Sequence, residues 1–191
     1  MDGFGYLVML VSVVAGLGLT HALSGMARIV QSRQDVRVSG VHLAWTGSIL
    51  LWLVSYWWFT FLFASIERWT VPLLIFILIY GSLIYFLIAL LYPDKWASGE
   101  NLLEHFIASR RWFFGAFVTL GILDIADTWV KTVLYDLPPP PMIPYYILMV
   151  SWLTFGITGA ITTNRLYHKA IAYAWLVVFG SWALALFAIG G

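Results

Sequence analysis

The chain contains no cysteine. A chain without thiols has no disulfide bonds, no thiolate nucleophile and no zinc or iron–sulfur centre held by cysteine. Charged residues are also scarce, because aspartate, glutamate, lysine and arginine make up only 10% of the 191 residues, against about 25% in soluble domains. So few charges do not solvate the surface of a soluble fold of this size, and we exclude a soluble globular enzyme.

The formal net charge is only +1, so the chain lacks the basic surface that a nucleic-acid partner requires. The phosphate-binding loop, the GxSxG and HExxH motifs and the dinucleotide fingerprint are all missing from the sequence. We therefore expect no nucleic-acid partner, and these missing motifs favour no enzymatic activity while leaving that question open.

The chain is rich in apolar residues, because hydrophobic types make up 62% of it. A helix needs about 20 mostly apolar residues to cross the hydrocarbon core of a bilayer. Six runs satisfy this length, at about 5–27, 41–64, 71–92, 112–133, 145–164 and 170–190. They are continuously apolar and do not alternate, which excludes a β-barrel. The sequence predicts an all-α, polytopic bundle of six transmembrane helices, in one integral membrane domain over residues 1–191.

The segments between the runs show how the helices connect. Pro138 to Pro141, together with Pro144, predict an extended break, because proline lacks the N–H group that a helix requires. Residues 101–111 have apolar side chains at helical spacing and predict a cytoplasmic helical extension of the fourth span. This extension either lies on the lipid headgroups or docks on the short loops. The first run has no basic segment before it and is expected to be a retained helix.

Lysine and arginine placement predicts the orientation of the bundle. We name the two membrane faces A and B, with the N-terminus on face B. Eight basic residues fall on face A, namely Arg28, Arg33, Arg37, Lys95, Arg110, Arg111, Arg165 and Lys169. Only Arg68 and Lys131 fall on face B. Face A is therefore expected to be cytoplasmic, with both termini on the non-cytoplasmic side.

The fourth span carries the densest group of polar residues within an apolar run. Gly121, Asp124, Asp127, Thr128 and Lys131 fall within an arc of roughly 120° on a helix. In one interpretation the stripe is structural: Asp127 and Lys131 pair at i,i+4, and Asp124 is protonated or bonded to a hydroxyl. The candidate hydroxyl partners are Ser55, Thr60, Ser151 and Thr154. In the other interpretation Asp124 and Asp127 line an outward-open cavity that binds a cation or a proton.

The first span carries a second polar group at the face A side. Its members are Thr20, His21, Ser24 and Arg28. His21 lies roughly 10 Å inside Arg28, and its side chain either relays protons or bonds a carbonyl group within the bundle.

The four histidines fall toward face A, which raises the possibility of haem b held between helices. A bis-histidine haem needs two ligands at matched depth. His21 is the one expected to be buried, whereas His42, His105 and His168 are expected near the membrane boundary. His21 and His42 are therefore weak haem-ligand candidates, and we predict no cofactor and no metal ligand beyond them.

Several short segments resemble small multi-pass bacterial inner-membrane proteins. They are Gly18-Leu19-Thr20-His21, Trp57-Trp58-Phe59, Arg110-Arg111-Trp112-Phe113-Phe114-Gly115 and Leu123-Asp124-Ile125-Ala126-Asp127-Thr128. The resemblance extends over most of the chain. It implies the bacterial inner membrane as the compartment, and it implies no particular chemistry.

Three functional hypotheses follow from these patterns. The first is a small channel- or transporter-like protein for a cation, proton or small solute, in which Asp124, Asp127, Thr128 and Lys131 form one half of a path. Thr20, His21, Ser24 and Arg28 would form the other half if the first and fourth helices adjoin. The second is a non-catalytic accessory or sensor subunit of a larger membrane complex, and the third is a haem b electron carrier. The expected partners are the lipid bilayer and either further copies of the chain or other subunits.

Overall fold

The computed structural model describes residues 3–32, 34–66, 69–93 and 99–189, and within these ranges it forms an all-α bundle. The six helices are α1 (Gly3–Gln31), α2 (Gly40–Phe59), α3 (Val71–Leu91), α4 (Leu102–Trp129), α5 (Met142–Ile161) and α6 (Arg165–Ile189). A 3₁₀ segment, η1 (Thr60–Ser65), extends α2, and a π-helical turn, η2 (Val130–Leu134), extends α4. All six helices are long and apolar enough to cross a membrane. The predicted six-helix bundle is confirmed.

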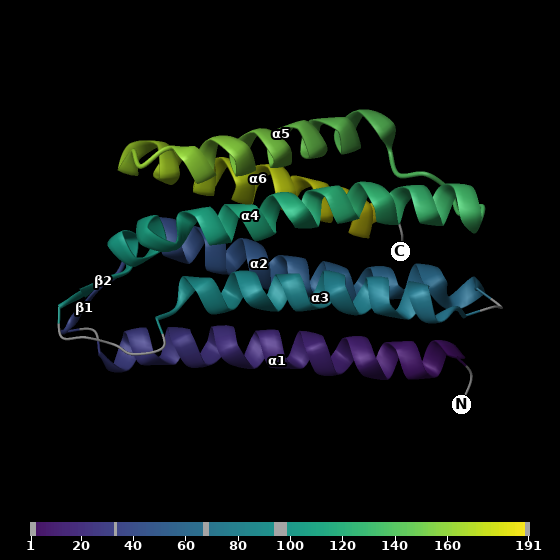
Figure 1. The fold of residues 1–191 in the computed structure, drawn as a ribbon, viewed down its shortest axis with the longest axis horizontal. Helices are drawn as coiled ribbons and strands as arrows, with labels where there is room; N and C mark the ends of the chain where they lie inside the picture. The colour runs from purple at the N-terminus through teal and green to yellow at the C-terminus, as the bar shows by residue number, and fades with distance from the viewer. Residues whose placement is uncertain (1–2, 33, 67–68, 94–98, 190–191) are drawn as a thin grey trace.

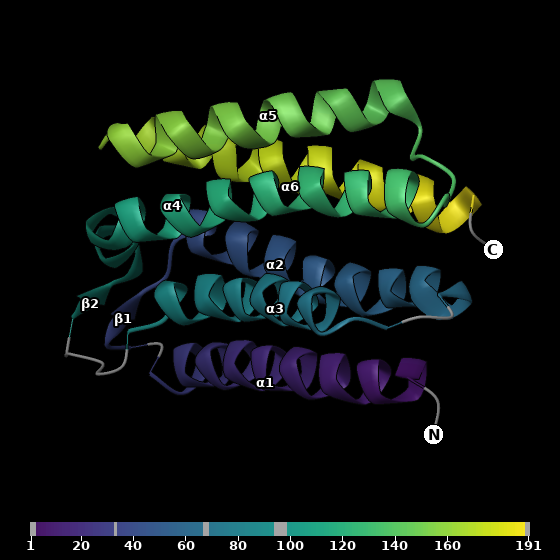
Figure 2. The same cartoon turned by 45° about the vertical axis from the view of Figure 1, so that its right-hand side comes forward.

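The helices run side by side in an up-and-down arrangement. Figure 1 shows α1, α3, α4 and α5 in succession, with α2 and α6 behind them, and Figure 2 shows the same order after rotation. α3 packs against both α1 and α4, and α2 packs against α1, α3 and α6. The first turn of α1 and the last turn of α6 lie at the same side of the bundle. We call this side end B, and we call the opposite side, where α1 finishes, end A.

The fourth helix is longer than one span of the bilayer. α4 and η2 form one helical segment of 33 residues, Leu102–Leu134, which is about 50 Å long. The residues of the predicted extension, 101–111, thus belong almost entirely to the first part of this helical segment. Phe106 in this part is fully buried, and its ring lies against Trp45 of α2 and His168 of α6. This part therefore packs mainly on helices and not on the short loops, which were one of its two expected positions.

The connections are short and locally capped. Side chains of Ser39 and Asn101 accept hydrogen bonds from the backbone at the starts of α2 and α4. Two-residue strands, β1 (Val36–Arg37) and β2 (Glu100–Asn101), pair in parallel at end A, which the sequence did not predict. Pro144 was expected in the extended break, yet it lies in the first turn of α5. A proline is tolerated there because the first N–H groups of a helix have no helical partner.

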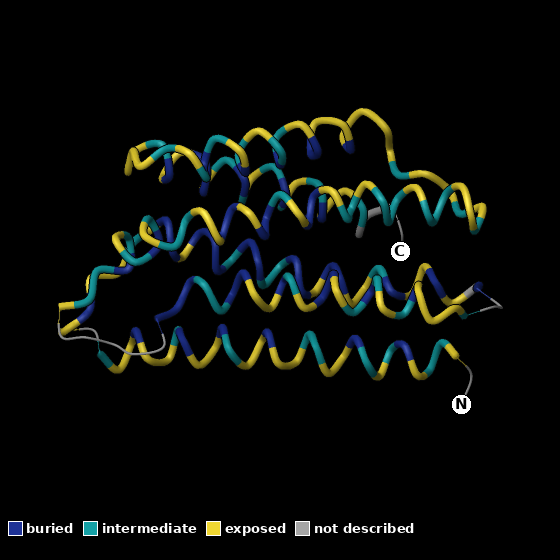
Figure 3. The backbone as a smooth tube through the Cα atoms, in the orientation of Figure 1, coloured by how far each residue is buried: buried dark blue, intermediate teal, exposed yellow. Residues whose placement is uncertain are grey.

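The core is rich in aromatic rings. Trp45 contacts Phe113, Phe114 and Phe117 with ring centroids 4.9–5.7 Å apart. Such edge-to-face contacts are favourable beyond the area that they bury. Figure 3 shows exposed residues on the outer sides of α1 and α5. Many of them are large and apolar, such as Leu17 and Ile143, as expected for a surface that contacts lipid.

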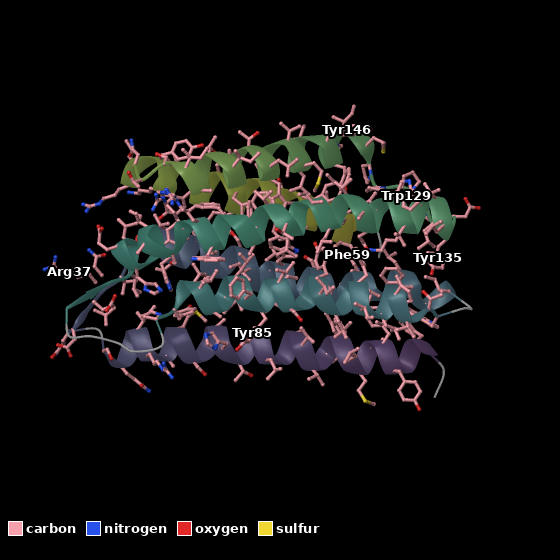
Figure 4. The ribbon with its side chains drawn as sticks, viewed as in Figure 1. Arg37, Phe59, Tyr85, Trp129, Tyr135 and Tyr146 are labelled. Atoms are coloured by element: carbon pink, nitrogen blue, oxygen red, sulfur yellow. The ribbon has the colours of Figure 1, made fainter. Side chains whose placement is uncertain are left out.

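The described basic residues are distributed unevenly between the two ends. Arg28, Arg37, Arg110, Arg111, Arg165 and Lys169 lie in the parts of the helices and the loop at end A, and Figure 4 labels Arg37 there. Lys131 lies toward end B. Arg33, Arg68 and Lys95, which also entered the predicted orientation, lie outside the described residues. The assignment of end A to the cytoplasm stays a prediction.

Candidate functional site

The polar stripe of α4 faces a cavity between the helices. The cavity has a volume of about 70 Å³, enough for several water molecules. Its wall includes Asp124 and Asp127 from α4, Lys131 from η2 and Tyr80 from α3. Residues of α2, α5 and α6 complete the wall, so that five of the six helices contribute. We call this cavity the outer pocket.

Asp124 is held by tyrosines from two neighbouring helices. The Tyr80 hydroxyl donates to Oδ1 at 3.0 Å, and the Tyr145 hydroxyl donates to Oδ2 at 3.3 Å. The serine and threonine partners expected from the sequence are not the ones used: the Ser55 and Thr60 hydroxyls donate to carbonyls of their own segment. The two tyrosines therefore fix the orientation of the carboxylate while leaving it in the wall of the pocket.

The depth of Asp124 follows from its contact with Tyr80. Tyr80 lies near the middle of α3, which has 21 residues and a length of about 30 Å. That length matches the hydrocarbon core of a bilayer. Asp124 therefore lies close to the middle of the predicted membrane, where ionisable residues are costly and normally face protein or water.

The second carboxylate of the stripe has a cationic partner. Lys131 Nζ forms an ion pair with Asp127 Oδ2, so the predicted i,i+4 pair is confirmed. The same ammonium group lies 4.7 Å from the centroid of the Phe63 ring, a distance suited to a cation–π contact. Thr128 is half-buried and its carbonyl accepts from Thr132, but it is not part of the pocket wall.

A second tier of aromatic side chains orients the tyrosine that holds Asp124. Trp52 Nε1 donates to the Tyr80 hydroxyl at 3.3 Å, which completes a chain from Trp52 through Tyr80 to Asp124. The Tyr56 ring stacks on Tyr80 with centroids 5.6 Å apart, and its hydroxyl donates to the Ile77 carbonyl. These contacts fix the Tyr80 ring, so the donor to Asp124 is preorganised.

Three of the four polar residues predicted as a group on α1 border a separate cavity at end A. His21, Ser24 and Arg28 line it together with Tyr92, and its volume is about 150 Å³. We call it the inner pocket. Thr20, the remaining member of the predicted group, is exposed and is not part of this wall. The α1 residues therefore form part of one site without Thr20.

The expectation that His21 is the buried histidine is wrong: His21 is half-buried, whereas His42 and His168 are fully buried, each near the start of its helix. His42 Nε2 lies 3.0 Å from the Leu91 carbonyl, and its ring packs edge-on against Tyr92. His168 Nε2 lies 3.0 Å from the Thr162 carbonyl. His21 and His42 both contact the Tyr92 ring. Within the described ranges, no group of three or more His, Asp or Glu side chains is placed to hold a metal ion.

The two pockets are not joined in this structure. The condition for a joint path was that the first and fourth helices adjoin, but α3 lies between α1 and α4 (Figures 1 and 2). Between Tyr80 and Tyr92, about 18 Å along α3, the inward side chains Ile84, Leu87 and Ile88 are fully buried. Gly18 of α1 packs closely on Ile88 and on Leu53 of α2. An apolar layer therefore separates the outer pocket from end A.

The two tyrosines that hold Asp124 were missed in the sequence, because neither Tyr80 nor Tyr145 was singled out there. One signal was available for Tyr80, since it is a hydroxyl-bearing residue at the centre of the most hydropathic span. No such signal exists for Tyr145, which stands at the end of a run where aromatic residues are common.

Comparisons with known protein families, with characterised proteins and with solved structures found no match to this chain. Functional inference therefore depends on the geometry of the two pockets.

Proposed function

We propose that this chain is a small membrane transporter that binds a cation at Asp124 in the outer pocket. The observation that carries the proposal is a carboxylate at mid-depth that lines a cavity without a cationic partner. Among the described residues, the ion pairs are Lys131 with Asp127 and Arg165 with Glu104, and neither includes Asp124. An uncompensated carboxylate at this depth is costly, and a bound cation or proton would balance it.

The site is accessible from end B in this proposal. Lys131, Thr60 and Phe63 belong to the end B parts of their segments, whereas Asp124 and Trp52 form the deeper part of the wall. A cation would thus enter past Lys131 and reach Asp124. The tyrosine hydroxyls would then keep the carboxylate in place as the cation binds.

The apolar layer favours alternating access over an open pore. Between Tyr80 and Tyr92, the buried side chains of α3 are all apolar, among them Ile84, Leu87 and Ile88. A continuous pore needs polar or hydrated walls along its length. We therefore propose that the structure corresponds to a state open toward end B, and that helix movements expose the site to end A in a second state. Such rocking motions around a fixed site are common among transporters.

Flux measured in proteoliposomes tests the proposal. Wild-type protein should move protons, K⁺ or small ammonium ions faster than protein-free liposomes, and Asp124→Asn should reduce that flux at least tenfold. Glu104→Gln is the matched control, because it removes one carboxylate at end A, away from both pockets. Its flux should equal that of the wild type. Flux no greater than in protein-free liposomes, or unchanged by Asp124→Asn, would contradict the proposal and favour the accessory-subunit hypothesis.

A further inference from the structure

The wall of the outer pocket is mostly aromatic. More than half of its residues carry aromatic rings, among them Trp52, Phe59, Phe76, Trp152, Phe179 and Trp182. Figure 4 shows Phe59 between α4 and α3. The polar groups of the wall are few, and the hydroxyls of Ser55, Tyr56 and Thr60 already donate to carbonyls. The pocket therefore offers many π faces and few free oxygen ligands.

This composition fits some cations poorly. Ca²⁺ takes six to eight oxygen ligands, and Mg²⁺ requires six in near-octahedral geometry. The oxygens at Asp124 are two carboxylate atoms already bonded to two tyrosines. A hydrated metal ion would also have to displace its water against indole and phenyl rings. An organic ammonium ion needs no such coordination shell, because its surface is partly apolar and its charge is attracted by ring faces.

One ammonium group of the protein itself is already bound in the pocket by a carboxylate and an aromatic ring. The ammonium group of Lys131 lies between the Asp127 carboxylate and the face of the Phe63 ring. Asp124 is likewise a carboxylate in the aromatic wall of this pocket, and it forms no ion pair with any of the described residues. Tyr145, which holds Asp124, packs against Trp182 with ring centroids 5.8 Å apart.

We propose that the ligand of the outer pocket is a small organic ammonium ion, paired with Asp124 and enclosed by the aromatic wall. This inference depends on the proposed function, because it names the class of cation that the transporter would bind. A cavity of about 70 Å³ admits a compact ion and not a large flat one. The nearby charge of Lys131 is balanced by Asp127, so the attraction of Asp124 for a second cation is preserved.

Calorimetric titration of the full chain in lipid nanodiscs tests the ligand class. The probes are methylammonium chloride, KCl, and methanol as a neutral molecule of similar shape. Methylammonium should bind, whereas KCl and methanol at equal concentration should not. Absence of binding by methylammonium, or equal binding by K⁺, would overturn the inference.

Variants then locate the bound ion. Asp124→Asn should weaken methylammonium binding about 10- to 100-fold, and Trp182→Leu about three- to thirtyfold. Trp182→Phe, which keeps a ring, should give a smaller loss and serves if the leucine variant is unstable. The matched control is Trp129→Leu, since Trp129 is 55% exposed and outside the pocket wall; it should bind as the wild type does. Equal affinity of the Trp182 and Trp129 variants would show that the ion is not in this pocket.

The two proposals fail in different ways. Flux of K⁺ or protons that depends on Asp124, without methylammonium binding, would overturn the ligand class and leave the transporter. Methylammonium binding that depends on Asp124, without flux of any tested ion, would overturn the transporter and leave a membrane protein that binds ammonium ions.

Discussion

The charge of Lys131 is balanced by one neighbouring side chain, that of Asp127. Its side chain and that of Asp127 are only 14% and 19% exposed, and they form an ion pair. Removing one member of such a pair leaves a poorly solvated charge, which costs more than the pair itself contributes.

Asp127→Asn should therefore destabilise the protein by about 1–3 kcal/mol, with a fall of several degrees in Tm. The double variant Asp127→Asn with Lys131→Met should recover most of the loss, because no charge is then stranded and a thioether still packs on Phe63. Thermal unfolding in detergent measures both. A double variant as unstable as the single one would show that the isolated charge is not the cause.

Asp124 and the side chains around it differ in how far the sequence alone reveals them. Asp124 and Lys131 were predicted because a charge within an apolar run is rare and demands an explanation. Tyr80 and Tyr145 were not, because an aromatic residue suits an apolar span or a membrane boundary equally well. Which hydroxyl reaches Asp124 depends on the register between α3, α4 and α5, and no local pattern encodes that register.

For the helices, the sequence predicted their lengths but not the contacts between them. Most of the spans were predicted within a few residues, because the length of an apolar run is a local property of the sequence. There are two exceptions: α4 begins ten residues before the predicted span at 112–133, and α6 begins five residues before the predicted span at 170–190. The predicted extension at 101–111 accounts for the first difference. The extension packs on residues of α2 and α6, such as Trp45 and His168, and β1 pairs with β2. Both contacts join segments that are distant in the sequence, so the sequence alone did not predict them.

Close contact between α4 and α5 depends on small residues. A methyl group added at Gly156 would collide with Val118 and would lie 3.2 Å from a carbon of the Phe117 ring. Gly115, on α4, has no atom within 4 Å of the corresponding position. Small residues at such crossings let two backbones approach closely in a membrane.

Gly156→Ala should lower stability by about 1–3 kcal/mol, because overpacking forces α5 away from α4. Gly115→Ala makes the same chemical change in open space and should be neutral or slightly stabilising, since alanine favours a helix over glycine. Unfolding in detergent compares the two variants. Equal Tm values for them would contradict the tight contact between α4 and α5.

For the whole molecule, the two ends differ in both charge and access. The described basic residues concentrate at end A, and the outer pocket extends from mid-depth toward end B. If end A is cytoplasmic, as the positive-inside rule predicts, the outer pocket lies toward the non-cytoplasmic side. The side from which the proposed transporter would take up its cation therefore depends on the orientation of the bundle.

The absence of native cysteine makes that orientation measurable with single-cysteine variants. Asp35→Cys places a thiol at an exposed position of the end A connection, and Pro139→Cys places one in the exposed connection at end B. In intact bacterial cells, a membrane-impermeant maleimide should label the Pro139 variant, whereas it should label the Asp35 variant only after permeabilisation. The wild-type chain reports the background, because it has no thiol to label. Labelling of the Asp35 variant in intact cells, with protection of the Pro139 variant, would reverse the orientation, and Asp124 would then be reached from the cytoplasm.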